Sequence, residues 1–190
     1  MMNIIKNDCT SEIIIKNSRF ICFLKYISTD TEAFSIIEDI KNKYKDSTHV
    51  TYAFRTLDKQ KFSDDGEPGG TAGAPIMEVI LKNDIVNILA IVVRYFGGIK
   101  LGAGGLIRAY SKSVRETLTK TNLCLYIKYN YYEIISSYDN LKLLNTLTNN
   151  LDITDKFFGE NITYKIKIKD ELDNIPSLFK NTDIKIRKLN

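Results

Sequence analysis

The residues with the clearest chemical potential are three carboxylates in one loop and the chain's one histidine. Asp64, Asp65 and Glu67 lie beside a glycine and a proline, and His49 lies on the predicted strand before them. Carboxylates and an imidazole that surround one pocket can bind a divalent cation or transfer protons. The candidate catalytic residues are His49, Asp64, Asp65, Glu67 and Arg94.

The same residues also have a purely structural interpretation. In it, Asp64 and Asp65 cap turns and pair with Arg55 or Arg94, while Thr71 caps the start of a helix. A lone histidine in a strand is more often a hydrogen-bonded structural residue than a ligand. Both interpretations stay open at this level. We expect no bound metal and no other cofactor, because the cysteines and the histidine show none of the usual ligand spacings.

A second feature is the concentration of glycine in two loops, residues 62–75 and 95–105. The second loop follows a buried strand and leads into a predicted helix from about Gly104 to Lys120. Glycines let the backbone approach an anion closely, and the free N–H groups at a helix start favour negative charge. The glycine spacing fits neither a P-loop nor a dinucleotide-binding fingerprint. We therefore expect this loop to bind the phosphates of a polymer rather than a mononucleotide.

The predicted helix carries a cluster of positive charge. Arg108, Lys112 and Arg115 are spaced to project from one face. The predicted apolar stripe of the same helix is Ile107, Tyr110, Val114 and Leu118. The candidate nucleic-acid-binding residues are Arg94, Lys100, Gly104, Gly105, Arg108, Lys112 and Arg115. The alternative is an ordinary amphipathic helix whose charged face is only solvated.

The elements that must position these residues follow an α+β order. Strands are expected around Asn17 and Ser18 and over 49–55 and 86–95, with helices over 31–44, 75–82 and 104–120. From residue 123 the pattern becomes β-α-β-β-α-β, a split βαβ arrangement. The predicted domains are residues 1–122 and 123–190.

Composition narrows the class of protein. The net charge is +4, and residues 94–128 hold seven Lys or Arg and one Glu, which favours an anionic partner. The longest uninterrupted aliphatic stretch, 88–93, is far shorter than the roughly 20 residues of a membrane span. Three isolated cysteines indicate no disulfide framework. We expect a cytoplasmic protein with no membrane partner, and predict no oligomeric state.

Three segments resemble the YigZ/IMPACT family, as a bacterial-type member: Thr48–Arg55, Phe62–Ile76 and Ile91–Val114. The resemblance covers about residues 5–120. It implies an N-terminal two-layer α/β domain like domain IV of elongation factor G, and a C-terminal ferredoxin-like domain like one found in that factor. Bacterial members are suspected of binding nucleic acid, whereas eukaryotic members with an added RWD domain act in translational control. Some relatives carry a proline-dipeptidase label, but one histidine and this loop hardly provide a two-metal ligand set.

These observations lead to one main hypothesis and two alternatives. The main hypothesis is an RNA-binding or ribosome-binding protein linked to translation or its regulation, with RNA favoured over DNA. The first alternative is a hydrolase or transferase whose pocket contains the carboxylates and His49. The second is a protein-interaction module. We lean against an enzyme.

Overall fold

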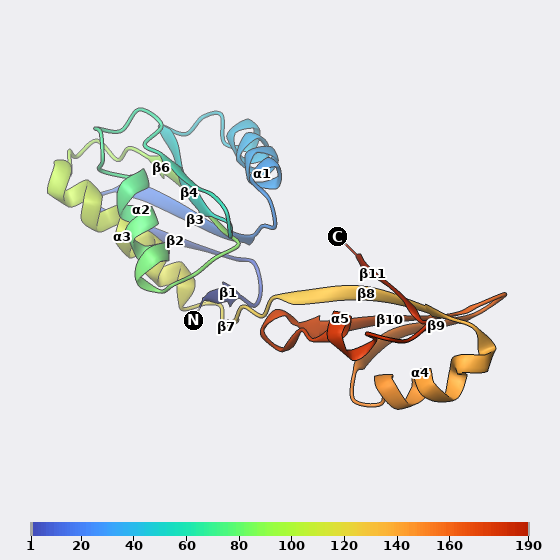
Figure 1. The fold of residues 1–190 in the computed structure, drawn as a ribbon. Coiled ribbons are helices and arrows are strands. Elements are labelled where there is room, and N and C mark those ends of the chain that lie inside the picture. Colours follow the sequence, from blue (N-terminus) through green and yellow to red (C-terminus); the bar gives the residue numbers. More distant parts are fainter. Residues whose placement is uncertain (1, 190) are drawn as a thin grey trace. The chain divides into compact units, whose positions relative to one another are not determined.

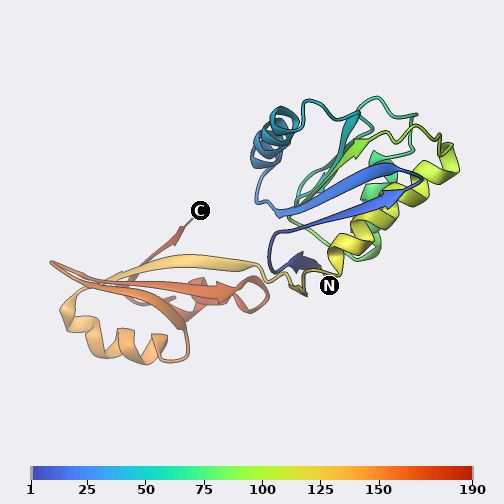
Figure 2. The same ribbon diagram turned by 180° about the vertical axis from the view of Figure 1, so that it is seen from behind.

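The computed structural model describes residues 2–189. The chain forms two compact units, Met1–Tyr126 and Ile127–Asn190, and Figures 1 and 2 show their elements from opposite sides. Both units combine helices with antiparallel sheets, which confirms the α+β class. No helix within the described residues is long and apolar enough to cross a membrane.

The first unit is built on a five-stranded sheet with the strand order β2-β3-β6-β4-β5, antiparallel throughout. Its strands are β2 (Cys9–Ile15), β3 (Ser18–Tyr26), β4 (His49–Arg55), β5 (Gln60–Ser63) and β6 (Ile88–Tyr95). The sequence pattern did not predict β5, because this short edge strand is mostly exposed and polar and so has no buried alternation to detect.

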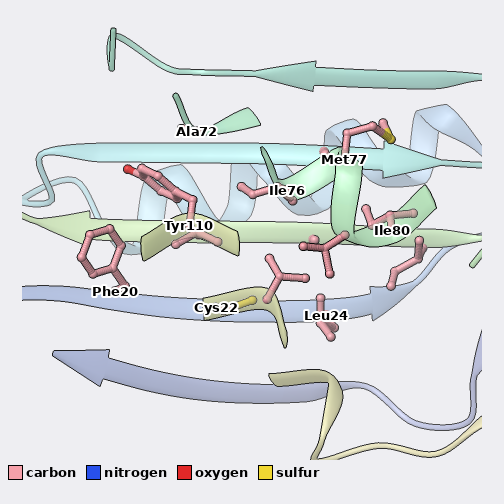
Figure 3. Close-up of a cluster of buried hydrophobic side chains, with 14 of the residues drawn as sticks. Phe20, Cys22, Leu24, Ala72, Ile76, Met77, Ile80 and Tyr110 are labelled. Atoms are coloured by element: carbon pink, nitrogen blue, oxygen red, sulfur yellow. The ribbon is translucent and has the colours of Figure 1, made fainter. Parts of the chain in front are cut away.

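Helices cover both faces of this sheet. They are α1 (Asp30–Lys43), α2 (Gly73–Lys82) and α3 (Ala103–Leu118). Phe20, Cys22 and Leu24 of β3 face α2 and α3 (Figure 3), whereas Ile21 and Phe23 of the same strand face α1. Helix α1 therefore adds a third layer to the two that were expected. Strand β6 is buried on both faces, and this fixes the position of the residues that follow it.

A two-stranded pairing joins the start of the chain to the end of the first unit. Strand β1 (Asn3–Ile5) pairs antiparallel with β7 (Leu123–Leu125), and Ile5 is buried in the core formed with α2 and α3. The division between the units falls after Tyr126, beyond the boundary at 122 and 123 drawn from the sequence. The reason is that the strand-like run 123–136 contains two strands, β7 and β8 (Tyr129–Ser136), which belong to different units.

The second unit has the predicted β-α-β-β-α-β order and the strand order β11-β8-β10-β9. Its main elements are β8 (Tyr129–Ser136), α4 (Leu141–Thr148), β9 (Asp152–Phe158), β10 (Ile162–Lys169), α5 (Ile175–Leu178) and β11 (Lys185–Leu189), with short 3-10 turns at Tyr138–Asn140 and Asp170–Leu172. One core cluster joins the sheet to both helices, so the helices lie on one face. This is the ferredoxin-like arrangement.

Candidate functional site

A cavity of about 380 Å³ lies where the two glycine loops of the first unit meet. Its polar lining includes His49, Glu67, Arg94 and Lys100, and its apolar lining includes Phe96 and Leu106. The sheet register explains part of this convergence, because His49 begins β4 directly opposite Arg94 near the end of β6. The cavity is within the size range of small-ligand sites.

Glu67 is the buried acid of the cavity, with a side chain only 3% exposed. Its Oε1 accepts a hydrogen bond from Arg94 Nη1 at 2.5 Å and another from the Tyr110 hydroxyl at 2.6 Å. Burial, followed by the bond to Glu67, raises the pKa of the Tyr110 hydroxyl far above its usual range. The tyrosine therefore stays a proton donor to this carboxylate.

Arg94 is nearly as buried as its acidic partner. Its guanidinium lies 5.5 Å from the Phe20 ring centroid and 5.6 Å from that of Phe96. Its Nη2 donates a long bond to the Ser18 hydroxyl, while its Nε has no hydrogen-bond partner among the described residues. One carboxylate and two aromatic rings hold the Arg94 guanidinium in place. It therefore fixes the positions of the side chains around the cavity.

His49 presents one ring nitrogen to the cavity. Its Nδ1 lies 2.7 Å from the backbone oxygen of Asp65, and a carbonyl can only accept, so Nδ1 carries a proton. In the neutral ring Nε2 is therefore unprotonated, and it lies 3.9 Å from Glu67 Oε2. This arrangement suits a group that accepts a proton from a bound molecule.

Asp64 holds the first glycine loop together instead of lining the cavity. Its carboxylate accepts hydrogen bonds from the backbone N–H groups of Gly70, Ala72 and Gly73. Burial alone would raise the pKa of this carboxyl, but those three N–H groups lower it below its usual range. Asp64 therefore serves the start of α2, where the sequence had suggested Thr71. The Thr71 hydroxyl donates to the Pro68 carbonyl instead.

Asp65 is also committed to the loop. Its carboxylate pairs with Lys41 and accepts a bond from the Val50 N–H. The pairing of Asp64 or Asp65 with Arg55 or Arg94 expected in the structural interpretation is wrong. Arg55 pairs with Asp84 and Arg94 with Glu67.

The buried network includes two residues, Tyr110 and Ser18, that the sequence pattern does not mark as site residues. The pattern assigns Tyr110 to the apolar stripe of α3 and Ser18 to a turn. The Ser18 hydroxyl accepts a bond from the Gly97 N–H, where the second loop crosses the β2–β3 turn. A Cβ on Gly97 would lie 2.0 Å from the Asn17 carbonyl carbon, so only glycine fits there. The hydroxyl of Tyr110 could have marked it as a site residue, because a buried tyrosine hydroxyl needs a hydrogen-bond partner.

Helix α3 begins at the cavity and carries the predicted basic residues on its exposed side. Gly102 caps it with a φ of 72° and without a side-chain hydrogen bond, and Gly102 and Ala103 line the cavity. Arg108, Lys112 and Arg115 are all exposed. Ile107 is 39% exposed, so its place in the apolar stripe was wrong: the buried stripe begins at Leu106, one position earlier.

The predicted site residues thus fall into three places. His49, Glu67, Arg94 and Lys100 meet at the cavity, whereas Asp64 and Asp65 stabilise its border. Gly104 and Gly105 lie in the first turn of α3, and the basic residues lie further along it. Within the described residues, no group of three or more His, Cys, Asp or Glu side chains could hold a metal ion.

Comparison with known proteins shows to which family this chain is similar. The family model of the Impact N-terminal domain matches residues 16–118. The IMPACT family member YvyE of Bacillus subtilis is 53% identical over 56% of this chain and 51% of its own length. An IMPACT family member of Haemophilus influenzae is 35% identical over 70% of this chain and 67% of its own length.

Two further proteins are also similar to this chain. YigZ of Escherichia coli is 40% identical over 55% of this chain and 53% of its own length. A crystal structure of a protein described as hypothetical matches with a TM-score of 0.69 and 26% identity, covering 100% of this chain and 97% of that one. The matched segment spans about half the length of the curated relatives YvyE and YigZ. The Impact N-terminal model covers more than half of these 190 residues, and the chain belongs to the IMPACT family.

Proposed function

We propose that this protein binds RNA, free or in the ribosome, and acts in translation or its regulation. The phosphate backbone would lie along the basic face of α3, which consists of Arg108, Lys112 and Arg115. The link to translation rests on the resemblance to translation-factor domains and to family members with a role in translational control. The contact with RNA rests on the charges of the first unit.

The observation that carries the proposal is that these cations lack carboxylate partners. Several basic side chains elsewhere in the first unit are paired: Arg19 with Glu12, Lys25 with Asp8, Lys41 with Asp65, Arg55 with Asp84 and Lys59 with Asp30. Other lysines, such as Lys6, Lys43 and Lys45, form no ion pair among the described residues but do not lie together on one helix face. Among the described residues, Lys100, Arg108 and Lys112 form no ion pair. Unpaired cations in a row are available to neutralise phosphates.

Arg115 lies at the border of this face. Lys82 is the main cause of a lowered pKa of the Glu78 carboxyl on α2, and Arg115 contributes to it at longer range. Its guanidinium is still exposed and forms no ion pair among the described residues. At the other end of the row, Lys100 lines the cavity. A strand of RNA on this face would therefore run from the cavity mouth along the helix.

The test removes the charges of the basic face. An Arg108→Ala, Lys112→Ala, Arg115→Ala variant is compared with the parent for binding of both single-stranded and duplex RNA over a salt series. We expect weaker binding to both, and a log–log salt slope flatter by about one unit for each phosphate that the variant no longer neutralises. Thermal stability should change little, because an exposed charge on a helix contributes only about 0.2–0.5 kcal/mol.

A matched control removes three exposed lysines outside α3. The Lys6→Ala, Lys43→Ala, Lys45→Ala variant has the same net charge as the α3 variant, and these three side chains are all exposed. If RNA binding follows only net charge, both variants lose affinity equally. Equal losses, or an α3 variant that stays folded and keeps its affinity and slope, would overturn the proposal.

A second candidate function is supported by the geometry of His49. In the neutral ring the free Nε2 lines the cavity with a buried carboxylate 3.9 Å away, which is an arrangement that suits a general base. A substrate of this kind would be anionic, since Lys100 and the start of α3 line the same cavity. A screen of phosphate and carboxylate esters for hydrolysis tests it. Turnover that His49→Gln abolishes would support it, and turnover unchanged by that substitution would refute it.

A further inference from the structure

The sheet of the second unit has one face without helices, which we term the open face. Helices α4 and α5 pack on the other side, where Tyr132, Ile134 and Ile166 are buried (Figure 1). Residues directly opposite in antiparallel strands share a face, so the register places the members of the open face. From β11 to β9 they form three rows: Leu189, Tyr131, Lys167, Asp152; Arg187, Glu133, Lys165, Asp155; and Lys185, Ile135, Thr163, Phe157.

Large aromatic rings are exposed on this face. Tyr131 of β8 is 47% exposed and Phe157 of β9 is 46% exposed. Tyr129, opposite Lys169, adds a third ring at the end of the face. Strand β10 lies between β8 and β9, and Tyr131 and Phe157 lie opposite Lys167 and Thr163, four positions apart along β10. The two rings are therefore roughly 16 Å apart across the sheet. Two exposed rings on one sheet face provide two separate surfaces on which bases can stack.

The rings are interleaved with lysines from β10. The Lys165 Nζ lies 4.9 Å from the centroid of the Phe157 ring, and the Lys167 Nζ lies 5.5 Å from that of Tyr129. Each cation is thus positioned beside a ring by an attraction within the protein. A ligand that stacks on a ring would find a positive charge next to its own phosphate.

The charge balance of the face favours an anion. Its cations are Lys165, Lys167, Lys169, Lys185 and Arg187, and its carboxylates are Glu133, Asp152 and Asp155. The pairs Arg187 with Glu133 and Lys167 with Asp152 neutralise two of these cations. Among the described residues, Lys165, Lys169 and Lys185 form no ion pair. Counted with the third carboxylate, Asp155, the face keeps a net charge of +2 beside three rings, which matches a polyanion with aromatic bases.

We infer that the open face binds single-stranded RNA by stacking bases on Tyr131 and Phe157 and holding its phosphates with the free lysines. This adds to the proposed function a second surface with a different specificity. Bases in a duplex are stacked on each other and are not available to protein rings, whereas an unpaired strand can spread its bases over a sheet. The basic face of α3, by contrast, is expected to hold phosphates of either form.

Two adjacent phenylalanines provide a matched pair of variants. Phe157 points to the open face, and Phe158, the next residue on the same edge strand, points to the helix side and is 61% exposed. In the full chain we compare Phe157→Ala and Tyr131→Ala with Phe158→Ala. The probes are a short fluorescein-labelled uridine oligonucleotide and an RNA duplex. A Tyr131→Phe variant keeps the ring but removes the hydroxyl.

Single-strand affinity should fall about tenfold for Phe157→Ala and for Tyr131→Ala, and stay unchanged for Phe158→Ala and Tyr131→Phe. Duplex affinity and the salt slope should be unaffected. Because the chain contains no tryptophan, quenching of tyrosine emission by the oligonucleotide, reduced in Tyr131→Phe, would report stacking on this ring directly.

The outcomes separate this inference from the proposed function. If the open-face variants bind single-stranded RNA like the parent while the α3 variant loses both probes, the inference is wrong and the proposed function stands. If the α3 variant binds RNA normally but the open-face variants do not, the inference stands and the basic face of α3 is refuted as the RNA-binding surface of the proposed function. A parent chain that binds neither probe overturns both, and leaves a protein as the occupant of the open face.

Discussion

Replacing Glu67 by glutamine should severely destabilise the first unit. The substitution preserves the shape of the side chain but leaves the Arg94 guanidinium, which is only 6% exposed as a side chain, without a counter-charge. Removing one member of a buried ion pair costs about 3–5 kcal/mol, because the remaining charge stays desolvated. The Arg94 Nε already lacks a partner among the described residues, so no second acceptor compensates. The loss is a large part of the about 5–15 kcal/mol that stabilises a typical domain.

Amide hydrogen exchange is the appropriate assay, because a chain of two units need not unfold in one step. Strand β6 is central in the sheet of the first unit and buried along nearly its whole length, so its amides exchange mainly through unfolding of that unit. Glu67→Gln should accelerate exchange in β6 by about two to three and a half orders of magnitude. Amides of β10 in the second unit should exchange as in the parent.

Glu78→Gln is the matched control, since it breaks a Glu–Lys pair whose side chains are 57% and 72% exposed. An exposed pair of this kind contributes about 0–1 kcal/mol. If β6 exchange in Glu67→Gln stays within about tenfold of the rate in Glu78→Gln, the buried pair stabilises the fold little more than the exposed pair does, and the reasoning is refuted.

Three further predictions concern other parts of the structure. Gly97→Ala should destabilise the first unit by about 1–3 kcal/mol in thermal melting, because its Cβ would overlap the backbone of the β2–β3 turn; Gly69→Ala, with nothing within 4 Å of its Cβ, should melt like the parent. Because the pKa of Asp64 is lowered on folding, its stabilising effect is complete above the unfolded value near 3.9 and is lost as the pH falls below it; Asp64→Asn should therefore flatten the loss of stability below about pH 4 in acid titration. Burial raises the pKa of the Cys22 thiol to about 12, so a thiol-reactive dye at pH 8 should modify exposed Cys124 rapidly and Cys22 only after unfolding.

The motifs allowed the place of the site to be predicted, but not the role of each residue in it. The strand with His49 and the buried strand 86–95 that contains Arg94 were predictable from apolar runs, and their pairing places both residues at one cavity. The separation of Glu67 from Asp64 and Asp65 was not predictable. All three are carboxylates within four positions, and only the loop conformation decides which one turns inward.

Elements with weak local patterns were also beyond prediction from the sequence. Strand β1 is three residues long and forms by pairing with β7, which lies far along the chain. The local sequence therefore has no periodicity from which β1 could be predicted. On α3, Ile107 is exposed although it is strongly apolar, while Ser113 and Thr117 are fully buried. Thr117 is satisfied there by the Ser113 carbonyl and the Ser11 hydroxyl. Such buried polar contacts depend on tertiary structure and override the apolar rule.

The pairing of β1 with β7 sets an order of events during synthesis on the ribosome. Ile4 and Cys124 face each other across 120 positions, so β1 has no partner strand until residues 123–125 are made. At about 5–20 residues per second, this wait is about 6–24 seconds. During it Asn3 can already bond to the backbone of Asp84 and Val86, and Ile5 can pack in the core, but β1 still lacks its strand partner. A contact of such long sequence separation also forms late, because a large loop must close first. The last strand of the first unit is made just before the second unit begins, so the nascent chain completes one fold as it starts the next.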